Sequence, residues 1–64
     1  MNIKALIGIE NCVLMVYYCR DKMYRFSIVN TIGKIYTCDN SFPTLSSAKL
    51  IGISTVKQFA IERQ

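Results

Sequence analysis

The sequence predicts an α+β fold in which a small antiparallel sheet of three or four strands packs on one C-terminal helix. Residues before the proline at position 43 form short alternating or apolar runs separated by polar turns, which is typical of strands. From Leu45 onwards, apolar residues recur every three or four positions, as they do on one face of a helix. With 64 residues, the chain is expected to be one domain, residues 1–64, whose isolated core is marginal.

The amino-terminal segment, residues 1–11, is expected to precede a β-β-β-α unit as an additional element. Its alternate positions hold Ile3, Ala5, Ile7 and Ile9, which favours a strand with these side chains on one face. Leu6 and Gly8 interrupt the pattern, so a helix stays open as an alternative. Glu10-Asn11 then predicts a turn.

The stretch from Cys12 to Cys19 has the strongest strand pattern, because it is rich in β-branched and aromatic residues and bounded by polar ones. Both of its faces are apolar, which is typical of a central strand or of one whose second face meets another chain. One helix covers only one face of a sheet. Tyr17 and Tyr18 point to opposite faces, so one of them is expected on the uncovered side.

Two further strands follow across short turns. Arg20-Asp21-Lys22 predicts a hairpin leading into Met23–Val29, and Gly33 provides the positive φ of the next turn before Lys34–Cys38. In the middle strand, the residues expected in the core are Tyr24, Phe26 and Ile28.

The helix is expected to begin at Leu45 behind Thr44, which is a good N-cap residue. Its buried face holds Leu45, Ala48, Gly52, Val56 and Phe59. Gly52 in the middle of this stripe predicts a close approach of the helix to the sheet. Leu50 and Ile61 fall on the opposite side of the helix and are weak candidates for a contact surface.

Three sequence motifs carry a resemblance to a known family. They are Tyr24-Arg25-Phe26-Ser27-Ile28, Gly33-Lys34-Ile35, and the helical pattern Ala48…Gly52-Ile53…Val56-Lys57. In order and spacing, the chain from about Leu14 to Gln58 resembles the YegP-like family of small uncharacterised proteins. It departs from the family at the turn Ile32-Gly33, where Asn-Gly is usual, and in its shortened first hairpin. The resemblance implies a β-β-β-α unit that occurs singly or in tandem, which suggests that units pair, and it implies no activity.

The composition argues against an enzyme, a cofactor or a metal site. The chain has no histidine, so the usual general base and the usual partner of a nucleophilic cysteine are absent. Cys12, Cys19 and Cys38 are odd in number and lack a Cys-x-x-Cys pair, which disfavours a disulfide framework or a zinc site. The amino end resembles neither a cleavable signal nor a membrane span, so a cytoplasmic protein without membrane contact is expected.

Two functions remain. The first is a non-catalytic protein-interaction or self-associating module, with a second copy (a homodimer) or another protein as its partner. The candidate interface residues are Ile3, Ile7, Ile9, Tyr17, Tyr18, Leu50 and Ile61. The alternative is a small nucleic-acid-binding domain that uses the sheet face, because the formal net charge is +4. Its candidate phosphate-binding residues are Arg20, Lys22, Arg25 and Lys34, but the apolar residues expected on that face favour a protein contact.

Overall fold

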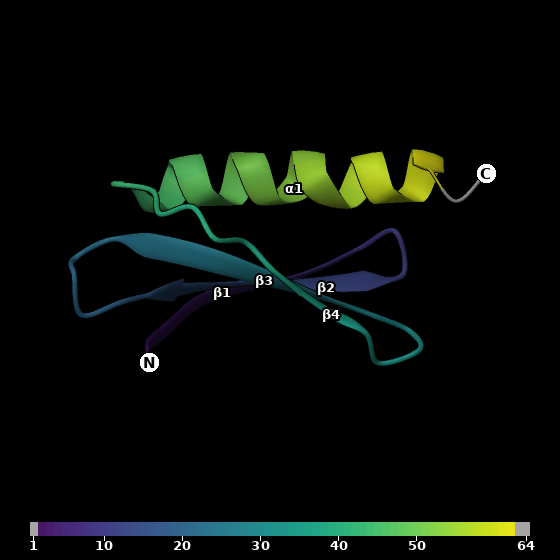
Figure 1. Ribbon diagram of the computed structural model, residues 1–64, viewed down its shortest axis with the longest axis horizontal. Helices are drawn as coiled ribbons and strands as arrows, with labels where there is room; N and C mark the ends of the chain where they lie inside the picture. The colour runs from purple at the N-terminus through teal and green to yellow at the C-terminus, as the bar shows by residue number, and fades with distance from the viewer. Residues whose placement is uncertain (1, 63–64) are drawn as a thin grey trace.

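A computed structural model describes the backbone of residues 2–62 and the side chains up to residue 59. Four strands, β1 (Asn2–Ile9), β2 (Cys12–Tyr18), β3 (Tyr24–Asn30) and β4 (Ile35–Thr37), precede one helix, α1 (Leu45–Glu62). The strands form a single antiparallel sheet in chain order, and α1 lies along one face of it (Figure 1). The predicted fold class is confirmed, and the amino-terminal segment supplies the fourth strand.

The hairpin turns form where the sequence predicts them. Glu10 and Asn11 have φ values of 53° and 62°, as the two central residues of a type I′ turn require. Gly33 has a φ of 85°, which confirms its predicted role. Asn30 organises this turn between β3 and β4, since its side-chain oxygen accepts hydrogen bonds from the backbone N–H groups of Ile32 (3.1 Å) and Lys34 (2.9 Å).

The turn between β2 and β3 places Lys22 in the left-handed region, with a φ of 65°. The Lys22 N–H donates to the Cys19 carbonyl oxygen at 3.0 Å, and the Cys19 N–H donates to the Met23 carbonyl oxygen at 2.9 Å. A carboxylate oxygen of Asp21 accepts from the Met23 N–H at 3.1 Å. The predicted hairpin is therefore confirmed without a glycine at its left-handed position.

The helix begins at Leu45 as predicted, because Thr44 caps it. The Thr44 hydroxyl oxygen accepts a hydrogen bond from the Ser47 N–H at 3.1 Å, which satisfies one of the free donors of the first turn. Upstream, Phe42 exchanges two backbone hydrogen bonds with Tyr24, of 2.7 and 2.8 Å, so the connection to the helix stays attached to β3.

The core lies between α1 and the sheet. Its buried members come from the two central strands, the residue that follows β4 and the predicted stripe of the helix: Leu14, Val16, Phe26, Ile28, Cys38, Ala48 and Val56. The close approach predicted at Gly52 is confirmed, because a Cβ atom there would lie 2.7 Å from Cδ1 of Leu14.

Candidate interaction surface

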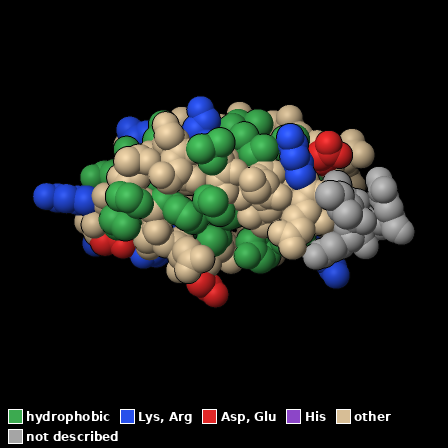
Figure 2. Space-filling view, turned by 90° about the horizontal axis from the view of Figure 1, so that it is seen from above, with side chains coloured by type: hydrophobic (Ala, Val, Ile, Leu, Met, Phe, Trp, Pro, Cys, Tyr) green, Lys and Arg blue, Asp and Glu red, His purple; other side chains and the backbone are tan. Residues whose placement is uncertain are grey.

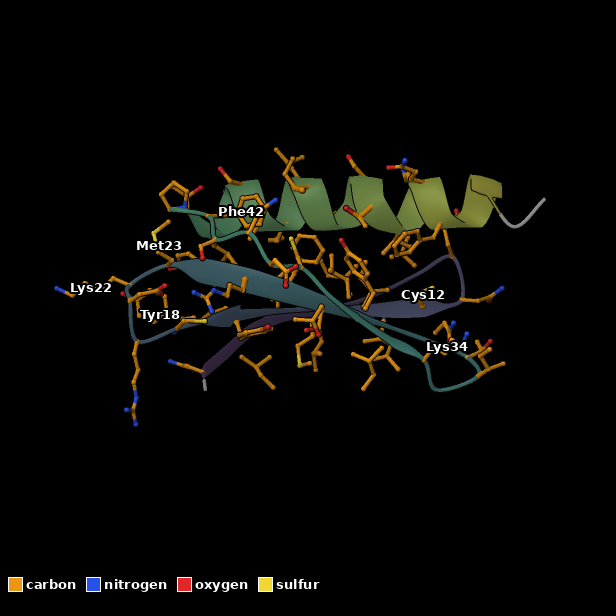
Figure 3. The ribbon with its side chains drawn as sticks, in the orientation of Figure 1. Cys12, Tyr18, Lys22, Met23, Lys34 and Phe42 are labelled. Atoms are coloured by element: carbon orange, nitrogen blue, oxygen red, sulfur yellow. The ribbon has the colours of Figure 1, made fainter. Side chains whose placement is uncertain are left out.

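The face of the sheet that points away from α1 is the candidate site, and we call it the open face. Strand pairing arranges its residues in three rows across the sheet. The first row is Gly8, Val13, Val29 and Ile35, the second is Leu6, Met15, Ser27 and Thr37, and the third is Ile3, Tyr17 and Arg25. Figure 3 shows side chains extending below the sheet, where no element of residues 2–62 covers them.

Large apolar side chains on the open face are exposed. The exposed fraction is 49% for Ile3, 64% for Leu6, 46% for Val13 and 68% for Ile35. They come from β1, β2 and β4, so the apolar surface extends over the full width of the sheet. A sheet face with several exposed large apolar side chains is a candidate for contact with another molecule.

Strand β1 differs from its predicted pattern in one respect. The alternation places Ile3 on one face with Ala5, Ile7 and Ile9, but the pairing with β2 shifts by one residue between Ile3 and Ala5. Lys4 is the extra residue of this β-bulge, and a bulge reverses the face on which the preceding residues lie. As a result Ile3 lies on the open face, whereas Ile7 and Ile9 are half-buried against the core beneath α1.

The two tyrosines lie on opposite faces. Tyr17 is on the open face, but only 9% of it is exposed, and its hydroxyl lies 3.4 Å from the Ser27 hydroxyl. Tyr17 therefore has little area left to bury against a partner. By strand alternation Tyr18 lies on the helix side, half-buried, with its ring centroid 5.0 Å from that of Tyr24. Aliphatic side chains thus provide most of the accessible apolar surface of the open face.

The outer side of α1 is the second apolar surface that the sequence suggested. Leu50 is 68% exposed and Ile51 beside it is 47% exposed. Figure 2 views this side of the molecule and shows hydrophobic side chains in separate groups among polar and backbone atoms. The side chain of Ile61 lies outside the described residues.

The polar groups of the open face gather toward β3 and β4. The Ser27 hydroxyl lies 3.4 Å from the Thr37 hydroxyl. Arg25 forms an ion pair with Asp21, with a nitrogen–oxygen distance of 2.8 Å, and its Nε donates to the Ser41 hydroxyl at 3.0 Å. The charge of Arg25 is therefore balanced within the chain, which leaves this part of the face polar but nearly neutral.

The four basic residues proposed for phosphate binding do not form one cluster. Arg20 and Lys22 share the turn after β2, whereas Lys34 lies near the opposite end of the long axis (Figure 3). Arg25 is engaged by Asp21. A phosphate backbone would meet separate charges at the two ends of the sheet and apolar side chains between them.

A cavity of about 450 Å³ lies between the turns at one end of the sheet and the later part of α1. Its apolar wall includes Tyr36 and Phe59, whose rings meet edge to face with centroids 5.1 Å apart. Glu10 and Lys34 supply charged groups, and Cys12 a thiol. With no histidine in the chain, this set offers no familiar pairing of a nucleophile with a base.

The described residues contain no group of three side chains suited to hold a metal ion. The three cysteines are unpaired, with Cys38 buried and the other two half-buried. Along the part of the chain that the structure describes, no helix has the length and apolar character needed to cross a membrane.

No protein-family model, curated protein or solved structure matches the chain. The resemblance to YegP-like proteins stays a prediction.

Sequence reasoning missed Leu6, Val13 and Ile35 as exposed residues of this face. Val13 was detectable, since it lies on one of the two apolar faces of its strand. Leu6 reaches the open face through its pairing with Met15, and the bulge at Lys4 brings Ile3 to the same face. Neither the strand register nor the bulge has a clear signal in one sequence.

Proposed function

We propose that the chain is a non-catalytic module that associates with a second copy of itself through the open face. The observation that carries this proposal is the exposure of Ile3, Leu6, Val13 and Ile35 on the face that α1 does not cover. Burial of apolar area is the main driving force of association, at roughly 25 cal/mol per Å².

The low charge of the open face is compatible with a second copy of the chain as the partner. Two chains with a net charge of +4 repel each other, so their contact must lie where charge is low. In the three rows of the open face the charged residue is Arg25, and Asp21 pairs with it. The lysines of the turns lie toward the ends of the molecule, where solvent and salt screen them.

Face-to-face contact is favoured over pairing of sheet edges. The free edge of β1 is interrupted by the bulge at Lys4, and a lysine with a bulge is a common device against edge pairing. Joining two sheets edge to edge would also leave Leu6 and Ile35 in water. Stacking two open faces removes both from water and gives a two-layer sandwich.

The area available predicts a dimer of modest affinity. Four strands about 4.8 Å apart and about six residues of 3.3 Å each give a face of roughly 400 Å². Two such faces reach only the lower limit of specific interfaces, so the dimer should form in a concentration-dependent way. The resemblance to YegP-like proteins, in which units are expected to pair, agrees with this proposal. The three unpaired cysteines support a reducing, cytoplasmic setting.

A matched pair of substitutions tests the face. Leu6 and Leu50 are exposed to nearly the same degree, 64% and 68%. Leu6 lies on the open face, whereas Leu50 lies on the outer side of α1. We expect Leu6→Lys to abolish the concentration-dependent rise in mass seen by light scattering, and Leu50→Lys to leave it unchanged. If Leu50→Lys alone disrupted association, the interface would lie on the helix. A wild-type protein that stayed monomeric would exclude self-association.

A further inference from the structure

The three glycines of the chain differ in the structural constraint that excludes a side chain. Gly33 adopts a positive φ, and Gly52 lies so close to Leu14 that a Cβ atom does not fit. Gly8 has neither constraint, because its φ is not positive and a Cβ atom there would meet no atom within 4 Å. A glycine inside a strand costs roughly 0.5–1 kcal/mol relative to alanine, and often marks a place where another chain approaches closely.

Gly8 lies on the open face, at one end of its first row. Across the strands, this Gly8–Ile35 row reads Gly8, Val13, Val29 and Ile35, so it begins with no side chain and ends with a large one. Ile35 is 68% exposed, whereas the position of Gly8 leaves a gap beside Val13. The size of the side chains thus increases from the β1 edge of the sheet to the β4 edge.

A row graded in this way is complementary to a reversed copy of itself. A two-fold axis that runs parallel to the strands, between β2 and β3, superposes the row on its own reverse. It then sets the largest residue of each copy opposite the smallest of the other, and Val13 opposite Val29. Such a self-complementary contact is what a two-fold dimer interface requires.

We infer that two copies stack through their open faces with Ile35 of each copy inserted over Gly8 of the other. The inference rests on the proposed function and deepens it, because it specifies the register of the dimer. The row extends over three strand spacings, about 14 Å, and stacked sheets lie about 10 Å apart. At that separation an isoleucine side chain from one sheet reaches the backbone of the other only where the facing residue is small.

Filling the gap gives the sharpest test. Gly8→Val places its Cβ atom where no other atom lies within 4 Å, and valine suits a strand, so thermal unfolding of the diluted monomer should be unchanged or shifted upward. The dimer dissociation constant, measured by sedimentation equilibrium, should nevertheless rise at least about tenfold, since valine occupies the space that Ile35 needs.

Two further variants distinguish the fit from general hydrophobicity. Thr37→Val adds apolar surface to the same face outside the Gly8–Ile35 row, and should leave association unchanged or tighter. Ile35→Ala should weaken it, and the double variant with Gly8→Val should associate no more weakly than Ile35→Ala alone, because alanine leaves room for the valine.

The outcomes separate this inference from the proposed function. A wild-type dimer that Gly8→Val leaves equally tight or tighter would overturn the inference and leave self-association standing. A wild-type protein that shows no dimer would overturn the proposed function, and the inference with it. Weakening by Gly8→Val but not by Thr37→Val, with the expected double-variant result, would support the stated register.

Discussion

Gly52 provides the strictest test of how α1 packs on the sheet. A methyl group at this position would lie 2.7, 3.0 and 3.4 Å from three atoms of the Leu14 side chain. Leu14 is fully buried, so its side chain can yield to the new methyl group only by shifting against its core neighbours. Gly52→Ala therefore combines a gain in helix propensity with an overpacked core.

The two contributions have different magnitudes. Alanine in place of glycine in a helix gains about 1 kcal/mol, whereas an extra carbon in a packed core costs about 1–3 kcal/mol. Because the whole end of the Leu14 side chain is contacted, we expect a cost in the upper part of that range. The free energy of unfolding should then fall by about 1–2 kcal/mol, which lowers the melting temperature by about 4–8 °C for each kcal/mol.

Urea denaturation followed by circular dichroism measures this change, at protein concentrations low enough to exclude association. Ser54→Ala, at an exposed position of the same helix, is the control and should gain a few tenths of a kcal/mol. The double variant Gly52→Ala/Leu14→Ala should lose less stability than the sum of its single variants, because the new methyl group occupies part of the cavity. A Gly52→Ala protein about 1 kcal/mol more stable than the wild type would refute the close packing.

Three other predictions concern local structure. Thr44→Ala should reduce the free energy of unfolding by about 1 kcal/mol, since the Ser47 N–H loses its partner. Urea denaturation measures this reduction. Lys22→Gly should raise that free energy by up to about 1 kcal/mol, because Lys22 has a positive φ that glycine adopts without strain; a loss of stability would contradict this. Thiol titration of the denatured protein, with metal analysis alongside, should find three free cysteines and no stoichiometric zinc, whereas fewer thiols or bound zinc would show that a cysteine is engaged.

Local signals in the sequence were sufficient to predict most of the fold. The alternation of Tyr24, Phe26 and Ile28, the N-cap at Thr44 and the glycine in the helical stripe each act over a few residues. Each is confirmed, with Phe26 and Ile28 buried in the core and Tyr24 half-buried against it. The amino-terminal segment stayed ambiguous because Leu6 and Gly8 interrupt its alternation. Pairing with β2 makes this segment a strand, and that contact between strands has no signal within the segment.

The candidate surface was less predictable than the fold. The doubly apolar strand β2 correctly indicated that one sheet face would lack cover, but it did not indicate which residues would be accessible there. Tyr17 is nearly buried by its own neighbours, while Leu6 and Ile35 are exposed. Exposure on a sheet depends on register and on the side chains beside each residue, and the bulge at Lys4 changes that register for Ile3.

The central claim, that the open face is buried when the protein associates, is tested most directly by solvent accessibility in solution. Nuclear magnetic resonance with a soluble paramagnetic probe reports the accessibility of individual methyl groups. We expect the probe to relax the methyl groups of Leu6 and Ile35 strongly at low micromolar protein. At about 1 mM, where even weak association is populated, this relaxation should be lost. The methyl groups of Leu50 should keep theirs. Equal accessibility of all three residues at both concentrations would contradict the account.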